Sequence, residues 1–298
     1  MRLIKPSYSI IEQPPGLEGV YKMIEIAGRT CYKSENNITE DSAKAFVDRM
    51  IKSGHGAMLE HGTVYLDIPW NATEEAFSLQ LKLRINKYDN NKYSRVVDTK
   101  EHHSYITTNL RVLVENGWLD DLQYICEPTE YHIKRVSVRF ICDRGVSHEF
   151  VRHRVFSFAQ ESTRYCNYSK DKFNNEITFI IPCWMDDSQV GHHDTGDIIN
   201  QAYNFLPVEC NPGEYEEILF MDIMAKAEFN YNELIKKGWK AQEARAILPN
   251  SLKTELVMTG FVSDWKHFFE LRDAKSAHPQ ALELASPLHQ EFLTRGYL

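Results

Sequence analysis

The chain has 298 residues, of which 43% are hydrophobic and 12% aromatic, so it carries ample material for a packed core. Its formal net charge of -8 argues against broad binding to nucleic acids or anionic membranes, because such binding requires a basic surface. The sequence contains no run of 18 apolar residues and no signal-peptide pattern, which predicts a cytoplasmic protein. No segment has the composition of a linker, and we expect one elaborated domain over residues 1–298.

The first predicted element is an amphipathic helix over residues 39–53. Its apolar residues recur at helical spacing, with Thr39 as a candidate N-cap and Gly54 as a C-terminal stop. This helix would deliver residues 55–60 at its exit.

Alternating apolar residues predict three strands further along the chain. The alternating residues are Val64, Leu66 and Ile68, then Leu79, Leu81, Leu83 and Ile85, and later Val136, Val138 and Phe140. A small antiparallel sheet built from these strands is the simplest expectation.

Two polar intervals separate the predicted elements. Residues 87–130 are rich in Tyr, His and Asn, and we interpret them as an elaboration of the fold. Residues 186–213 are similarly polar and are predicted to be rich in loops, with Pro207 and Pro212 as breakers.

The pattern from Glu214 onward is mostly helical. Breaks are expected near Gly238, Pro249 and Pro279. Because the predicted strands come before the helices and do not alternate with them, the order of elements indicates an α+β fold.

The segment from Arg152 to Tyr165 combines three arginines, a histidine and two serines, a composition suited to holding phosphate. If Arg152, His153 and Arg154 were helical, their side chains would point about 100° apart and would serve two ligands or two subunits. A chance cluster of surface charges is the alternative. The apolar residues between the charges count against it, because arginines held beside buried apolar groups need partners.

The spacing of this segment resembles the signature of the flavin-dependent thymidylate synthases. The shared pattern is Arg-His-Arg, two residues, Ser, four residues, Ser, one residue and Arg-Tyr. Further segments resemble the same family in the same order, so that the resemblance extends from about residue 20 to residue 285; they are residues 27–32, 54–61, 242–249, 268–272 and 277–280.

This resemblance implies a central, mostly antiparallel sheet flanked by helices, and a homotetramer with active sites at subunit junctions. It implies that FAD is the cofactor and that dUMP is methylated to dTMP. Methylenetetrahydrofolate would donate the carbon and NADPH would reduce the flavin. No metal, nucleic acid or membrane partner is expected.

The resemblance also assigns roles to particular residues. The expected FAD contacts are His55, Glu60, Arg152, His153, Arg154 and His267. The expected dUMP contacts are Gln160, Glu161, Ser162, Thr163, Arg164, Arg245 and Arg272. Arg272 and Ser162 are placed at the reacting centre.

Arg272 would face the pyrimidine and stabilise the negative charge that develops when the ring is activated. Ser162 is assigned to binding, since the local sequence offers no base in fixed geometry to activate it as a nucleophile. Taken without the family, His55 and Glu60 would be solvated surface residues and Arg245 would form a salt bridge on a helix surface.

Three residues depart from the family pattern. Glu149 stands where many members have Gln, and its charge would repel a nucleotide phosphate. Phe261 and Ser263 stand at positions that are often Asn and Arg.

Two other functions remain open from the sequence. One is a related flavoenzyme that adds another one-carbon group, such as hydroxymethyl, to a pyrimidine nucleotide. The other is a catalytically silent oligomer that binds nucleotides without flavin.

Overall fold

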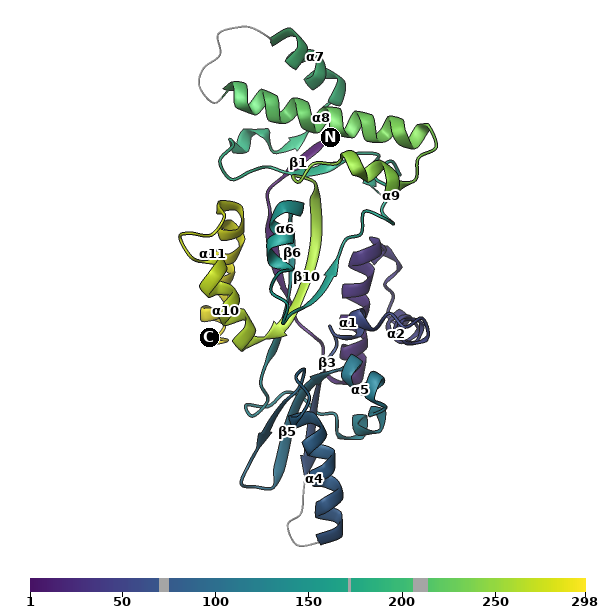
Figure 1. The fold of residues 1–298 in the computed structure, drawn as a ribbon, viewed down its shortest axis with the longest axis vertical. Coiled ribbons are helices and arrows are strands. Elements are labelled where there is room, and N and C mark those ends of the chain that lie inside the picture. The colour runs from purple at the N-terminus through teal and green to yellow at the C-terminus, as the bar shows by residue number, and fades with distance from the viewer. Residues whose placement is uncertain (70–74, 171–172, 206–213) are drawn as a thin grey trace.

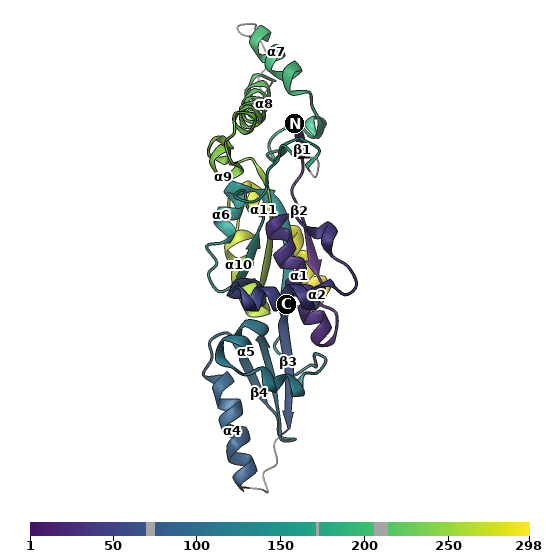
Figure 2. The same cartoon turned by 90° about the vertical axis from the view of Figure 1, so that its right-hand side faces the viewer.

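The computed structural model describes residues 1–69, 75–170, 173–205 and 214–298. The molecule is elongated, and three parts that each contain a sheet follow one another along its long axis (Figure 1 and Figure 2). Antiparallel pairing predominates in these sheets, so the prediction of a mixed fold of helices and antiparallel sheets is confirmed. Among the described residues, no helix is both long and apolar enough to cross a bilayer.

The middle part is a four-stranded antiparallel sheet. Its strands, in spatial order, are β2 (Ser7–Ile11), β6 (Arg135–Asp143), β10 (Lys253–Phe261) and β7 (Ser157–Gln160). The strand predicted around residues 136–140 is confirmed as part of β6.

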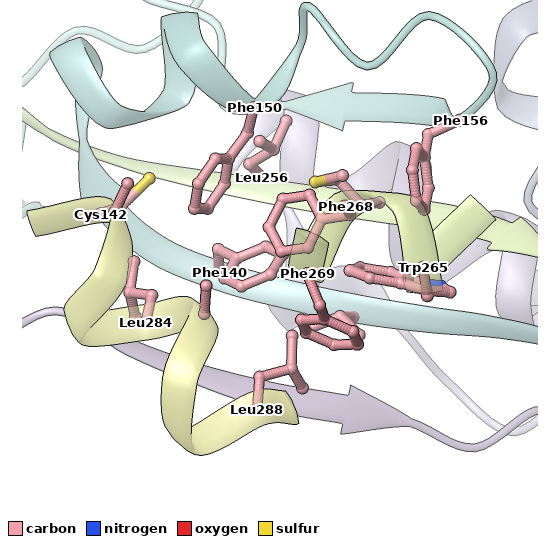
Figure 3. Packing of buried hydrophobic residues seen from close by; sticks show 14 of the residues in the cluster. Phe140, Cys142, Phe150, Phe156, Leu256, Trp265, Phe268, Phe269, Leu284 and Leu288 are labelled. Carbon is pink, nitrogen blue, oxygen red and sulfur yellow. The ribbon is translucent and has the colours of Figure 1, made fainter. Parts of the chain in front are cut away.

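One face of this sheet packs on α6 (Arg144–Phe150), α10 (Val262–Arg272) and α11 (Pro279–Thr294) (Figure 3). Phe140 and Trp265 are fully buried there, and the Trp265 Nε1–H donates to the Val136 carbonyl at 3.1 Å. Burial of such large aromatic side chains dominates core energetics. The opposite face packs on α1 (Gly16–Tyr32).

Strand β10 corrects the prediction that the chain is mostly helical after residue 214. Leu256 and Met258 face α10 and α11, while Val257 faces α1, so apolar residues occupy both faces. A strand buried on both sides shows a continuous apolar run without alternation, and periodicity alone cannot distinguish it from a buried helix. The remainder of the prediction is confirmed by α8 (Glu214–Lys236), α10 and α11.

The lower part in Figure 1 is a lobe formed by residues 63–69 and 75–124. It contains β3 (Thr63–Pro69), β5 (His103–Asn109) and β4 (Arg95–Asp98) in one antiparallel sheet, with α4 (Glu75–Asp89), α5 (Leu110–Asn116) and the 3₁₀ helix η2 (Leu119–Tyr124). The strand predicted at residues 64–68 is confirmed as β3, although β3 and β6 belong to different sheets. Most of the elaboration predicted at residues 87–130 lies in this lobe, which also includes β3 and α4.

The strand predicted from Leu79 to Ile85 is wrong, because these residues lie in α4. Leu79 and Leu83 are 61% and 62% exposed, whereas Ile85 and Tyr88 are buried. Residues four apart share one face of a helix, so Leu79 and Leu83 lie together on the solvent side. The alternating leucines that suggested a strand therefore belong to a helix, and two of them are exposed to solvent.

The upper part contains the sheet β8 (Thr178–Ile180), β1 (Arg2–Ile4) and β9 (Gly191–His192), in which β1 and β8 are parallel. It also contains η4 (Asp187–Gln189), α7 (Thr195–Phe205), α8, α9 (Ala241–Ala244) and η5 (Arg245–Ile247). Residues 186–213 were predicted to be rich in loops, but η4, β9 and the eleven residues of α7 occupy much of the described part of this interval. The predicted breakers Pro207 and Pro212 lie outside the described residues.

The predicted helix at residues 39–53 is confirmed as α2 (Ser42–Lys52), which follows η1 (Glu35–Asn37). Its N-cap is Asp41 and not Thr39, whose N–H donates to the Ser42 hydroxyl at 2.9 Å. Gly54 has a φ of +71°, a left-handed conformation that suits glycine after a helix end. The short helix α3 (Gly56–Leu59) follows and carries Glu60 at its end.

Candidate functional site

The turn that follows β7 carries three predicted phosphate ligands in a fixed geometry. The Ser162 N–H donates to the Cys31 carbonyl at 3.0 Å, and the Arg164 N–H donates to the Ser162 hydroxyl at 3.3 Å. Arg245, 82 residues further on, donates through Nη1 to the Thr163 hydroxyl at 2.9 Å. The fold therefore brings Arg245 to the turn of residues 162–164, and both arginines stay exposed toward solvent.

Gln160 and Glu161 lie on opposite faces of the central sheet. Gln160 donates through Nε2 to the hydroxyls of Ser147 and Thr254, at 2.8 and 3.2 Å. Glu161 is 2% exposed, and its carboxylate accepts from Lys253 Nζ at 2.8 Å and from the Tyr168 hydroxyl at 3.1 Å. Both Glu161 oxygens accept hydrogen bonds inside the protein, so this side chain anchors the start of the 162–164 turn to the core.

Lys253 links Glu161 to a second buried carboxylate, Glu255. Glu255 accepts from Lys253 at 2.6 Å and from Lys33 at 2.8 Å, and it also pairs with Arg139. Burial would raise the pKa of Glu255, but Lys253 and Lys33 outweigh it and lower this pKa from 4.5 to about 2. We call these five side chains, including Glu161, the paired cluster; each of its charges has an opposite partner.

Arg272, in the last turn of α10, is held by Glu149 of α6 and by His153, which lies just after α6. Its Nη1 donates to a Glu149 carboxylate oxygen at 2.5 Å and its Nη2 to the Glu149 carbonyl at 2.9 Å, while its Nε donates to His153 Nε2 at 3.1 Å. The charge of Glu149, which departs from the family pattern, is thus neutralised by Arg272.

His153 is 8% exposed, and its ring lies 5.1 Å from that of Phe268. Burial, together with the charges of Arg272 and His267, lowers the pKa of His153 from 6.5 to about 4. The imidazole is therefore neutral near pH 7, with Nε2 as the acceptor and the proton on Nδ1.

The Arg-His-Arg tripeptide lies in the turn after α6, which ends at Phe150, and not in a helix. His153 points inward while Arg152 and Arg154 are exposed on either side of it. Arg152 and Arg154 are thus both free to meet groups outside this turn, and the expectation of two ligands or two subunits stays a prediction. His267 is 62% exposed and lies 3.2 Å from the Glu270 carboxylate.

A cavity of about 440 Å³ lies where the lobe meets the central sheet, and Glu60 and Arg154 both line it. Phe261, the second departure from the family pattern, lines it too, whereas His55 and Ser263, both exposed, are not among its lining residues. The Glu60 carboxylate also pairs with Arg111 of α5.

The cavity is also lined by three cations that were not predicted from the sequence, namely Lys92, Arg95 and Arg135. Lys92 and Arg95 belong to the lobe, whose sequence shows no family motif. Arg135 offered a signal, since it is a charged residue at the start of an apolar alternation and is 9% exposed in the structure.

The fold and these sites define a mixed α/β protein with arginine-rich surfaces at the 162–164 turn and at the cavity beside the lobe. A family model described as thymidylate synthase complementing protein matches residues 129–294, and the chain belongs to this family. The matched region starts after the lobe and contains the 162–164 turn, Arg245 and Arg272.

The chain is similar to several proteins named flavin-dependent thymidylate synthase. It is 30% identical to the protein of Pyrococcus furiosus over 154 residues, 52% of each chain. It is 24% identical to that of Corynebacterium aurimucosum over 265 residues, 88% of this chain and 72% of the relative. It is 30% identical to that of Mycobacterium bovis over 176 residues, 59% of this chain and 61% of the relative.

Proposed function

We propose that this protein catalyses the FAD-dependent reductive methylation of dUMP to dTMP, with methylenetetrahydrofolate as carbon donor and NADPH as reductant. The observation that carries the proposal is the contact between Arg245 and Thr163, which joins two segments 82 residues apart into one arginine-rich turn. Such a turn offers hydroxyls, backbone N–H groups and guanidinium groups to a phosphate.

The residues around the cavity fit a flavin. Among the described residues, Lys92, Arg95 and Arg154 line this cavity without an ion pair to a carboxylate, so the cavity offers cationic donors to an anionic cofactor. Glu60 and Arg154 would contact the cofactor within the cavity, and Arg152, His153 and His267 would bind it from the neighbouring turn and helix. When bound, the flavin supplies the hydride that completes the methyl group. His55 stays a predicted contact.

Arg272 would hold the uracil ring and stabilise negative charge on its carbonyl oxygens. Neutral His153 accepts from Arg272 Nε and fixes the direction of the guanidinium. Ser162 and Arg164 would bind the dUMP phosphate with Arg245, while Gln160 and Glu161 hold the turn in place.

The assembly belongs to the same proposal. Among the described residues, the hydrogen bonds of the Arg272 side chain go to Glu149 and His153 and none goes to the 162–164 turn. A homotetramer would let these groups of different subunits converge on one nucleotide. We likewise propose that residues 1–298 act as one cytoplasmic enzyme domain with the lobe and the region around residues 186–213 as elaborations.

The test is conversion of dUMP by the protein supplied with FAD, NADPH and methylenetetrahydrofolate, with products identified by mass spectrometry. Arg272→Ala should abolish dTMP formation and leave FAD bound, whereas Lys266→Ala, an exposed cation on the same helix, should behave as the wild type. Normal turnover by Arg272→Ala would contradict the role of Arg272. A hydroxymethylated product, or dUMP binding without flavin, would support one of the other two functions.

A further inference from the structure

The cavity between the lobe and the central sheet has an excess of positive charge. Four of its lining side chains are cations, Lys92, Arg95, Arg135 and Arg154, and two are carboxylates, Glu60 and Asp264. The lining therefore carries a formal surplus of two positive charges. Pairing of Glu60 with Arg111, a residue outside the lining, uses part of its negative charge elsewhere.

These cations lack anionic partners. In the part of the chain that the structure describes, none of the four lies within 4.0 Å of a carboxylate oxygen. Arg135 is 9% exposed, it donates only to the Glu60 carbonyl and the Thr63 hydroxyl, and its Nε has no partner. Burial lowers the pKa of Arg135 to about 10, since no carboxylate lies close enough to offset the loss of solvent.

Arg135 is the buried member of this set, whereas Arg95 is half-buried and Lys92 and Arg154 are exposed, so the cavity presents unpaired positive charge to an anion from outside the chain. The lobe supplies two of the four. Arg95 lies over the Phe261 ring at 4.5 Å and donates to the Lys92 and Ser94 carbonyls, which holds its guanidinium at the cavity wall. Lys92 lies over the ring of Tyr93, which is 52% exposed and lines the same cavity.

This combination matches a phosphorylated dinucleotide better than a simple carboxylate. A surplus of two charges equals the charge of a diphosphate diester, guanidinium forks match phosphate oxygens, and the exposed Tyr93 ring offers a surface on which a base can stack. We propose that the lobe forms one wall of a dinucleotide site and that Lys92 and Arg95 hold the diphosphate. Glu60 and Arg154 reach the same ligand from the family core. The proposal rests on the proposed function in taking FAD as its first ligand, and NADPH has the same diphosphate chemistry.

The test is a binding titration of the full-length protein with FAD, FMN, riboflavin and NADP⁺, followed by calorimetry or flavin fluorescence. Arg95→Gln is expected to weaken FAD binding by about tenfold to a hundredfold, the usual effect of removing a charge-assisted hydrogen bond. Riboflavin, which has no phosphate, should bind both proteins equally. Lys100→Gln removes an exposed cation elsewhere in the lobe and should bind FAD as the wild type does.

A second variant guards against a folding artefact, because Arg95 also donates to two carbonyls of its own turn. Lys92→Gln leaves those bonds in place and should weaken FAD binding in the same direction, with an unchanged thermal unfolding curve. FAD affinities that are equal in Arg95→Gln, Lys92→Gln and Lys100→Gln would overturn the dinucleotide site while leaving the flavin enzyme intact.

The ligand series separates the two proposals further. If NADP⁺ binds and depends on Arg95 while no flavin binds, the dinucleotide site is supported and the proposed function fails. If the wild type binds neither FAD nor NADP⁺, both are overturned.

Discussion

The charged side chains of the paired cluster form ion pairs with one another, whereas the cations of the cavity beside the lobe form none among the described residues. Around Glu255, Lys33, Lys253 and Arg139 each find a carboxylate, and Lys253 also serves Glu161. In the cavity, Arg135 is 9% exposed, and none of the carboxylates that the structure describes lies within 4.0 Å of it. Burial alone therefore does not mark a ligand site, because the buried charges of the paired cluster are satisfied within the protein.

The largest expected effect concerns the paired cluster. Glu255→Gln removes the buried carboxylate that Lys33, Lys253 and Arg139 share. Lys253 keeps Glu161 and Lys33 keeps Glu35, but all three cations lose their common partner, which lowers the free energy of unfolding by about 3 kcal/mol. Urea denaturation at pH 7 measures this loss. Glu233→Gln, at an exposed ion pair with Lys236, is the matched control and should change the value by less than about 0.5 kcal/mol. Equal losses in the two variants would show that the cluster is not a special source of stability.

The pH dependence of stability isolates the same carboxylate. The pKa of Glu255 falls from 4.5 to about 2 on folding, so the folded state binds this proton less readily than the unfolded state. The stabilisation is complete above pH 4.5 and is lost as pH falls through 2, an effect of about 3 kcal/mol. The difference between wild type and Glu255→Gln should therefore shrink between pH 5 and pH 2, and a constant difference across this window would contradict the assignment.

A smaller effect is expected at the ion pair between Glu149 and Arg272. Glu149→Gln keeps the carbonyl contact at 2.9 Å but removes the negative charge beside the guanidinium. We expect the KM for dUMP to fall by about threefold to tenfold, which corresponds to about 1 kcal/mol, because Arg272 no longer shares its positive charge with Glu149 and presents it to the nucleotide. Steady-state kinetics measure this change. An increased KM would indicate that Glu149 positions Arg272 through its charge.

The smallest effect on the free energy of unfolding is expected at Arg95, in the cation-lined cavity. Arg95→Gln should change the free energy of unfolding by less than about 0.5 kcal/mol without ligand, since Arg95 forms no ion pair among the described residues. Urea denaturation of the protein freed of bound nucleotides tests this expectation. A loss as large as that of Glu255→Gln would mean that Arg95 serves the fold and not a ligand.

Local patterns predicted some elements and missed others for identifiable reasons. Strands β3 and β6 each bury alternate residues more strongly on one face, and their alternation was visible in the sequence. Strand β10 is buried on both faces and was missed, while the leucines of α4 imitated a strand. The 152–165 motif contains the turn that Arg245 contacts through Thr163, and this turn could be located from the sequence because its residues are contiguous.

From the sequence alone came the mostly helical pattern after residue 214, the strands around residues 64–68 and 136–140, and the hypothesis that residues 152–165 bind phosphate. Only the tertiary structure decided that Glu149 neutralises Arg272, that Glu161 and Glu255 are fully paired, and that Lys92 and Arg95 of the lobe line a cavity with Arg154. The reason is physical. Hydrophobic periodicity and turn chemistry act between near neighbours, whereas the pairing of buried charges depends on which distant segments the folded core brings within hydrogen-bond distance.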